Sequence, residues 1–201
     1  SEGYHPHPKL SFGPALALGI ASTSEYFDVG LGREMEPASI QNSLNQVLPE
    51  SLRITAAGRL NEPVIPLNAL INRAAYRIEL TMVPQSLPGV KADLAAIISK
   101  QELVVSRNTK TGQKMVNIRP LLHNLTMVET SEDPGDRAHV LFVFDISGEI
   151  GNNGNLRPDE ITGLIKQPLT VSGITRIGLW REERGMIIKP MDLCVQRPKI
   201  Q

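Results

Sequence analysis

The stretch AYRIELTMVPQSLPGVKADLAAIISKQ, residues 75–101, places a strand directly before a helix and is the clearest fold signal in this chain. Residues 75–83 alternate apolar with polar side chains, which predicts a strand. Pro84 and Pro88 mark the loop that follows. Residues 89–101 predict an amphipathic helix. The apolar positions that share one face of this helix are Val90, Leu94, Ile97 and Ile98.

The segments after this helix continue the series of strands and helices. Working forward along the chain, we predict hairpin strands at 102–107 and 114–122, an acidic loop at 129–136, a buried strand at 138–146, a helix at 157–166, and closing strands near 174–181 and 186–195. With the hairpin set aside as an elaboration, the order becomes βαββαβ. This is the order of the split βαβ, or ferredoxin-like, fold.

The first part of the chain shows the last four elements of the same series. We predict strands at 10–21 and 24–31 joined by a turn at Ala21–Ser24, a helix from Pro37 to Leu48, and a strand at 52–60. The opening strand and helix of the series are missing. We therefore expect an α+β fold with two tandem ferredoxin-like (split βαβ) halves on antiparallel sheets, an incomplete first half at 1–66 and a second half at 67–201.

The composition is that of a globular chain without an overall charge. The 201 residues are 41% hydrophobic, and 21 Lys and Arg balance 21 Asp and Glu. No global field therefore attracts a nucleic acid or a membrane. The longest apolar run is far shorter than a membrane span. We predict a cytoplasmic protein with no membrane partner.

The single cysteine and the few histidines limit the chemistry of the chain. One cysteine, Cys194, excludes a disulfide framework and a cysteine-held iron–sulfur cluster. His5 and His7 alone are too few ligands for a metal site. His123 and His139 have no acid at a telling spacing in the sequence. We therefore predict no catalytic residue, no metal site and no cofactor in this chain.

Positive charge in the second half gathers on the predicted hairpin. Its four basic residues, which we predict to bind nucleic acid, are Arg107, Lys110, Lys114 and Arg119. Paired strands can project such side chains from one end or one face, where they suit contacts to phosphate groups. The candidates to extend this patch are Arg176, Arg181 and Arg184. An ordinary solvated hairpin is the alternative, and the few aromatic residues argue against readout by base stacking.

The opening of the chain, SEGYHPHPKLSFGPALALGIASTSEYFDVGL, carries a second distinctive set of residues. The motif positions are Gly3, Tyr4, His5, Pro6, His7, Pro8, Lys9, Ser11, Phe12, Glu25 and Asp28, together with Ser1, Gly19, Ser22 and Tyr26. In this motif the chain resembles a bacterial radical-SAM-linked protein family, a domain of unknown function encoded beside, or fused to, a radical S-adenosylmethionine (radical SAM) protein. The hairpin resembles the same family, which more often has Asp at the position of Asn117.

The resemblance implies both a missing segment and a partner. Members of the family usually begin with a strand and a basic helix, so we expect this chain to be truncated at its N-terminus. Without that cover, the first half should expose an apolar surface or receive cover from another chain. The radical chemistry would lie in a radical SAM partner. We therefore predict a non-catalytic, RNA-associated accessory domain that works with this partner, with the RNA part resting on the basic hairpin and on analogy to the fold.

Two other interpretations stay open. One is a metal-independent RNA-processing enzyme of the tandem ferredoxin-like type, in which His5, His7 or a family histidine of the expected missing segment would act. The other is a pure protein-interaction subunit whose basic patch docks an acidic surface. A concave site where a histidine meets a second titratable group would favour the enzyme. A continuous positive surface would favour a binding domain.

Overall fold

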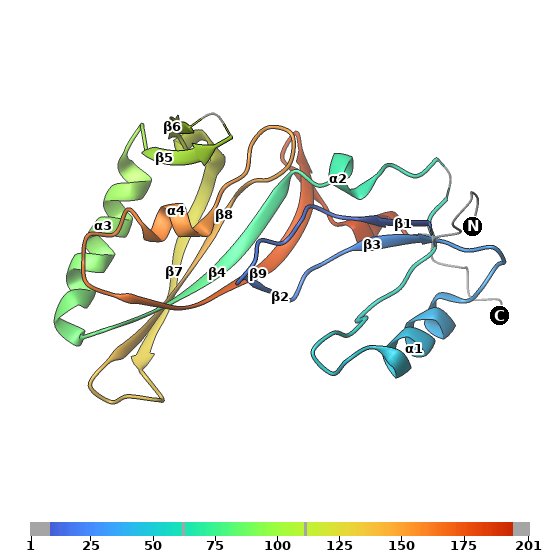
Figure 1. Ribbon diagram of the computed structural model, residues 1–201, viewed down its shortest axis with the longest axis horizontal. Coiled ribbons are helices and arrows are strands. Elements are labelled where there is room, and N and C mark those ends of the chain that lie inside the picture. Colours follow the sequence, from blue (N-terminus) through green and yellow to red (C-terminus); the bar gives the residue numbers. More distant parts are fainter. Residues whose placement is uncertain (1–8, 62, 111, 195–201) are drawn as a thin grey trace. The chain divides into compact units, whose positions relative to one another are not determined.

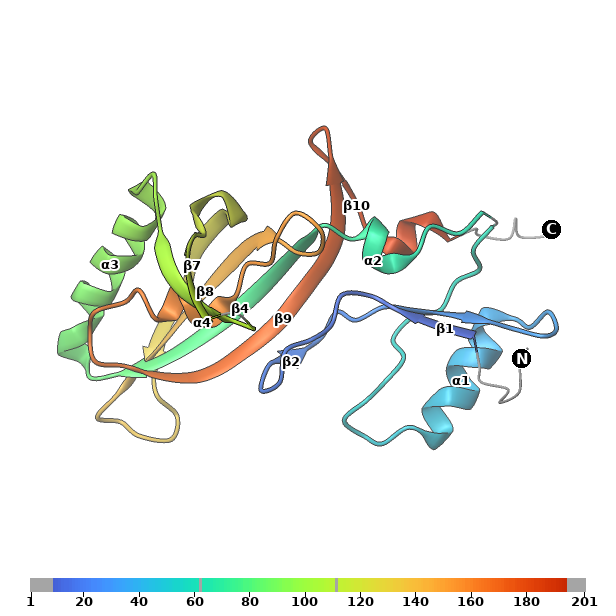
Figure 2. The same cartoon turned by 45° about the horizontal axis from the view of Figure 1, so that its top comes forward.

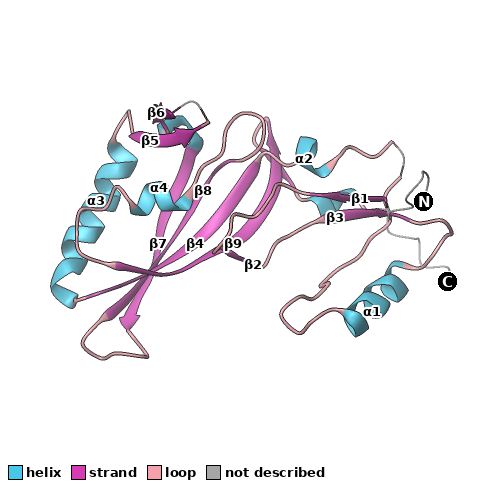
Figure 3. Cartoon of the chain, viewed as in Figure 1, coloured by secondary structure: helices cyan, strands magenta, loops and turns pink. Residues whose placement is uncertain are grey.

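The computed structural model describes residues 9–61, 63–110 and 112–194. Figure 1 colours the chain along its sequence and Figure 3 by secondary structure, and together they show an α+β protein. None of the helices in these ranges has the length and apolarity needed to cross a membrane. The residues of the protein cluster into two compact units, and each unit is made of segments that are separate in the sequence. The first draws on Ser1–Pro14, Tyr26–Ile71 and Trp180–Gln201, and the second on Ala15–Glu25 and Asn72–Leu179.

The second unit is built on one sheet with the strand order β9-β4-β8-β7. Strand β8 pairs antiparallel with both β4 and β7, whereas the short β2 lies parallel to β9. Strand β9 runs on into the first unit from Trp180. The elements are β2 (Ala21–Ser22), β4 (Arg73–Met82), η1 (Pro84–Ser86), α3 (Leu87–Ser99), β5 (Val104–Thr109), β6 (Gly112–Asn117), η2 (Arg119–Leu121), β7 (Leu122–Glu132), β8 (Val140–Glu149), α4 (Pro158–Thr162) and β9 (Thr170–Glu183), where η marks a 3-10 turn.

This sheet buries one face and leaves the other half-exposed. Along β4, alternate side chains are buried, and Ile78 and Leu80 have no exposed surface. Helices α3 and α4, seen from a second direction in Figure 2, contribute buried side chains such as Leu94 and Ile161 to this core. Each such side chain stabilises the fold by about 1.5–3 kcal/mol. The half-exposed residues of β4, on the opposite face, are Arg73, Ala75, Arg77, Glu79 and Thr81.

Two predictions in the second unit are wrong. The predicted acidic loop at 129–136 contains the end of β7, and the turn begins only at Asp133. The predicted strand at 114–122 ends at Asn117, and η2 separates it from β7. Strand β7 escaped prediction because it is an edge strand. From Thr126 onward its side chains are exposed on both faces, so no apolar alternation marks it.

The first unit combines a two-stranded ribbon with short helices. Strands β1 and β3 are antiparallel, with Leu10 opposite Val29 and Phe12 opposite Phe27. Strand β10 pairs with the end of β9, and Pro37 begins α1 as predicted. The elements are β1 (Lys9–Phe12), β3 (Phe27–Gly30), α1 (Pro37–Val47), α2 (Leu67–Leu70), β10 (Met186–Ile188) and η3 (Pro190–Leu193).

The predicted tight turn between the first two strands is wrong. At Gly13 the chain is still held to the ribbon, because its N–H donates to the carbonyl of Tyr26 at 3.0 Å. The residues in between, Ala15–Glu25, belong to the second unit, where Ala21 and Ser22 pair with β9. Polar contacts hold the segment Ala15–Glu25 in this position, and the hydrophobic pattern of the sequence does not reveal such contacts.

The predicted strand at 52–60 is also absent, apart from a single bridge at Arg59. The peptide groups of Ile54 bond to amide side chains of α1 instead. Asn45 accepts from the Ile54 N–H at 2.8 Å and donates to the Ile54 carbonyl at 2.9 Å, as Gln41 also does. Because these amides satisfy the groups that a neighbouring strand would use, the segment is extended without joining a sheet.

Candidate functional site

The basic hairpin forms a two-stranded sheet of its own within the second unit. Strands β5 and β6 pair antiparallel, and Arg107 lies directly opposite Lys114. The half-buried Val105 and Val116 pair on the same face. Like charges at facing positions repel each other. The hairpin therefore gathers basic side chains on one face, and at least one of them needs a counter-charge.

Glu160 of α4 supplies that counter-charge to Arg107. The guanidinium donates to both carboxylate oxygens, at 2.6 and 2.7 Å, and its Nη2 also donates to the carbonyl of Asn155 at 2.9 Å. The two side chains are only 15% and 9% exposed. The hydrogen bond to Glu160 is the main cause that raises the pKa of Arg107. Arg107 thus anchors the hairpin to α4, and its charge is compensated internally.

Arg119 also bonds within the unit, to backbone carbonyls. Its guanidinium donates to the carbonyls of Lys100 at 2.9 Å, Leu122 at 2.8 Å and Ile98 at 3.3 Å. Two of these carbonyls close the C-terminal end of α3, where a positive side chain is stabilised by the helix dipole. Asn117 holds the same corner, because its Oδ1 accepts the N–H of Arg119 at 3.0 Å.

Lys110 and Lys114 differ from the two arginines because their side chains are exposed. Within the described residues, neither shows a hydrogen bond or an ion pair. Of the four predicted binding residues, the two lysines therefore present free charge, and the two arginines are held by internal contacts. That all four bind nucleic acid stays a prediction.

The three arginines that the sequence suggests as extensions of the patch have different surroundings from its exposed lysines. Arg176 is 1% exposed and pairs with Glu25. Arg181 pairs with Glu183 at 3.0 Å on the same strand. Arg184 sits in the turn before β10 with a φ of 52°. The first two of these arginines are thus compensated by carboxylates.

Glu25, a residue of the opening motif, forms a clamp with Arg176 that holds the segment Ala15–Glu25 against β9. Arg176 donates to Glu25 through Nε at 2.7 Å and Nη2 at 2.5 Å, and through Nη1 to the carbonyl of Ala15 at 3.2 Å. The hydroxyl of Ser22 also donates a hydrogen bond to Glu25 at 2.5 Å. Burial, the largest influence, raises the pKa of Tyr76 beside this clamp. Sequence analysis missed the clamp because the partners are 151 residues apart.

The remaining motif residues divide between the ribbon and a part that is not described. Gly3, Tyr4, His5, Pro6, His7 and Pro8 lie outside the described residues, and Lys9, Ser11 and Phe12 form β1. Ser11 faces Asp28 across the ribbon. Burial raises the pKa of Asp28 above its usual value. This face of the ribbon is therefore polar and partly shielded.

The other face of the ribbon is apolar and open. It is made by the cross-strand pairs Leu10–Val29 and Phe12–Phe27, with the two rings 6.0 Å apart. Leu10, Phe12 and Val29 are 45%, 64% and 37% exposed. The first unit thus leaves these apolar side chains open. Monomers seldom leave such faces uncovered when they extend over several large side chains.

Two histidines have acidic partners that the sequence spacing did not reveal. His123 Nε2 lies 3.0 Å from Glu149 Oε1, and Arg73 Nη1 lies 2.7 Å from the same oxygen. His139 Nδ1 lies 2.9 Å from Asp136 in the turn after β7. The Glu149 contacts run between neighbouring strands, so only the sheet register could have shown them. In the described part of the chain, no three potential metal ligands among His, Cys, Asp and Glu come together.

A comparison with known families covers most of this chain. Residues 1–158 match the family described as an uncharacterized protein conserved in bacteria (DUF2344). The match takes in both the opening motif and the basic hairpin, and spans more than half of the 201 residues. None of the curated proteins matches the chain. The chain therefore belongs to the DUF2344 family of uncharacterized bacterial proteins.

Proposed function

We propose that this chain is a non-catalytic accessory subunit that works bound to a second protein, with the apolar face of the β1–β3 ribbon as the contact. The open pairs Leu10–Val29 and Phe12–Phe27 carry this proposal. A two-stranded ribbon is marginally stable in water without cover on its apolar face. A partner that covered the face would contribute about 1.5–3 kcal/mol for each large apolar side chain that it buries fully.

Helix α1 of the same unit supports this proposal. It buries no residue, although Ile40, Leu44 and Val47 follow the spacing of an apolar stripe. Val47 is 79% exposed. The helix is held to its own unit by the amides of Gln41 and Asn45. Ile40 and Leu44 are half-buried, whereas Val47 at the end of the stripe is left for another contact.

The partner class comes from the family resemblance, which suggests a radical SAM protein. A single cysteine cannot hold an iron–sulfur cluster of the usual three- or four-cysteine kind. The cluster and the radical chemistry would then belong to the partner. In this division of labour, the present chain positions the partner or a substrate.

RNA is the second contact that we propose, and the hairpin supports it. Lys110 and Lys114 are exposed and can contact phosphate groups without losing an internal partner. The half-exposed face of the sheet offers less, because Arg77 bonds to both oxygens of Asp145 at 2.9 Å. An RNA would therefore contact the hairpin rather than the sheet.

We also infer that the second unit is ferredoxin-like. The order β4, α3, β7, β8, α4, β9 and the sheet order β9-β4-β8-β7 support this inference, with β5 and β6 as an added hairpin. For the first unit, the support for an incomplete second copy of this fold is limited to the ribbon and α1.

The test is the affinity of the full chain for a purified radical SAM protein from the same bacterium, with two matched variants. Leu10→Asp places a charge on the ribbon face and should weaken binding by more than about tenfold. Leu18→Asp changes an exposed leucine of the second unit in the same way and should leave the affinity unchanged. No binding by the parent chain, or equal binding by both variants, would refute the proposal.

A further inference from the structure

Strand β7 ends the sheet of the second unit, and its outer edge is open. Among the described residues it pairs with β8 alone. All residues from Thr126 to Glu132 are exposed, and a bulge separates Met127 from Glu129. The unpaired N–H and C=O groups of such an edge can accept a further strand from another chain.

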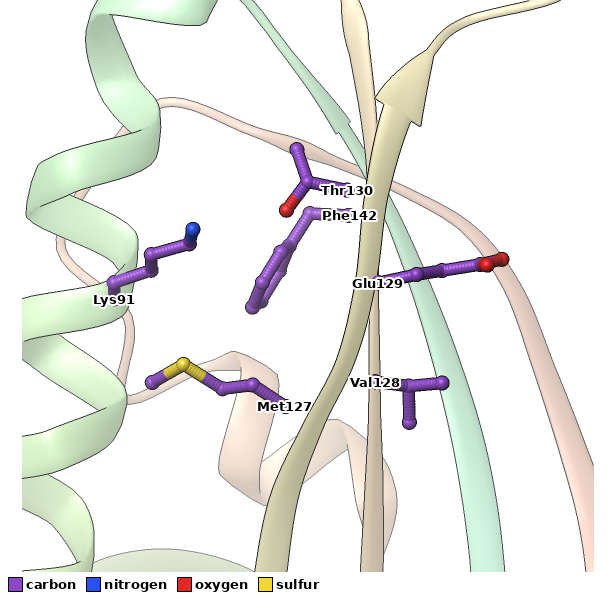
Figure 4. A pocket seen from close by; sticks show the side chains of 6 residues that line it. All are labelled: Lys91, Met127, Val128, Glu129, Thr130 and Phe142. Carbon is purple, nitrogen blue, oxygen red and sulfur yellow. The ribbon is translucent and has the colours of Figure 1, made fainter.

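A cavity of about 260 Å³ lies beside this edge, next to α3. Figure 4 shows Met127 and Thr130 pointing toward α3, and Glu129 pointing to the other side of the strand. Phe142 is almost fully buried at the cavity, and Lys91 Nζ lies 5.8 Å from the centre of its ring. Because Lys91 already supplies a positive charge here, the cavity suits an apolar side chain better than a second cation.

The opposite side of the edge is acidic. Arg77 there is paired with Asp145, and this hydrogen bond is the main cause that raises the pKa of Arg77. Glu129 and Glu79 are close enough to add to the same effect. Arg77 is thus paired with Asp145, and the carboxylates of Glu129 and Glu79 act on the same guanidinium through their charge. Within the described residues, Glu129 shows no hydrogen bond or ion pair of its own.

We propose that the β7 edge binds an extended segment of a partner protein in which apolar residues alternate with basic residues. Successive side chains of a strand point to opposite faces. A segment added beside β7 would therefore direct its apolar side chains toward the cavity at Met127 and Phe142. Its basic side chains would lie on the opposite face, beside Glu129, where opposite charges on adjacent strands stabilise the pairing.

The charges of the edge favour this occupant over two others. A second copy of this chain paired edge to edge around Glu129 would bring the two Glu129 carboxylates onto the same face of the joined sheet, and like charges on adjacent strands repel. A nucleic acid would meet the same carboxylates with its phosphates. A basic segment of another protein would meet neither of these repulsions.

The test uses a short peptide in which arginine alternates with valine and leucine, with binding to the full chain followed by fluorescence anisotropy. The expected result is that glutamate in place of arginine weakens binding about tenfold or more. A third peptide with methylated backbone nitrogens keeps the side chains but cannot form strand hydrogen bonds, and it should not bind. Hydrogen exchange should slow in β7 when the arginine peptide is present.

Two charge-reversal variants locate the site. Glu129→Lys should weaken binding of the arginine peptide several-fold, whereas Glu102→Lys, an exposed reversal outside β7, should leave it unchanged. Absence of binding, equal binding of all three peptides, unchanged exchange in β7, or dimers formed through β7 would overturn the proposal. The Leu10→Asp variant should bind the peptide normally, so failure of this site is distinct from failure of the ribbon contact.

Discussion

The Arg107 guanidinium donates both to the Glu160 carboxylate and to a carbonyl of the loop before α4. Removing one partner of a largely buried ion pair leaves the other charge without compensation. We expect Arg107→Ala to lower the free energy of unfolding by about 3 kcal/mol. Lys114→Ala, at the facing position, should change it by less than about 0.5 kcal/mol. Urea denaturation of the two variants checks this, and equal losses would contradict the anchor role.

Asp28 gives a prediction for the dependence of stability on pH. Burial raises its pKa above the usual 3.8, so the folded state keeps a proton that the unfolded chain has released. The free energy of unfolding should therefore fall as the pH rises through the window just above 3.8. Asp28→Asn should be more stable than the parent at neutral pH, and this advantage should disappear near about pH 3. A larger advantage at low pH would contradict the assignment.

At the scale of single elements, α1 depends on polar side chains for its attachment. Asn45 makes both an accepting and a donating bond to Ile54. We expect Asn45→Ala to cost about 1–2 kcal/mol and to expose residues 52–60 to proteolysis. Asn42→Ala, at an exposed position of the same helix, is the matched control and should have little effect. Equal cleavage rates in the two variants would show that another contact holds this segment.

Element types with a strong apolar period could be predicted from the sequence, and those without one could not. The stripe of α3 and the alternation of β4 follow from burial on one face, so both elements appear where expected. In strand β7 and in the segment 52–60, the apolar pattern of the sequence does not match burial on one face of a strand. From Thr126 onward the first has no buried face, and the second has an alternating pattern but bonds to helix side chains.

The candidate site was predictable only where it is local. Neighbouring residues of one hairpin bring Arg107 and Lys114 together. The contacts that fix their roles come from distant segments, such as Glu160 for Arg107 and Ile98 for Arg119. Charge counting cannot distinguish a free basic residue from a compensated one, because the partner depends on the tertiary fold.

At the scale of the whole molecule, the proposed RNA contact predicts a defined dependence on salt. Each phosphate contact adds close to one unit to the slope of log affinity against log salt. Replacing Lys110 and Lys114 with Ser should therefore weaken RNA binding and reduce the slope by up to about two. Sequence preference should stay the same, because phosphates carry no base information. Unchanged affinity and slope would remove RNA and leave protein binding as the function.

Hydrogen exchange of the ribbon, with and without the proposed radical SAM partner, tests the central proposal most directly. In the free chain the amides of β1 and β3 should exchange quickly, because a two-stranded ribbon with an open apolar face is only marginally stable. Binding should slow exchange at Leu10, Phe12, Phe27 and Val29. The Leu10→Asp variant should show no such slowing. A partner that binds while these amides exchange as quickly as before would contradict the ribbon as the contact surface.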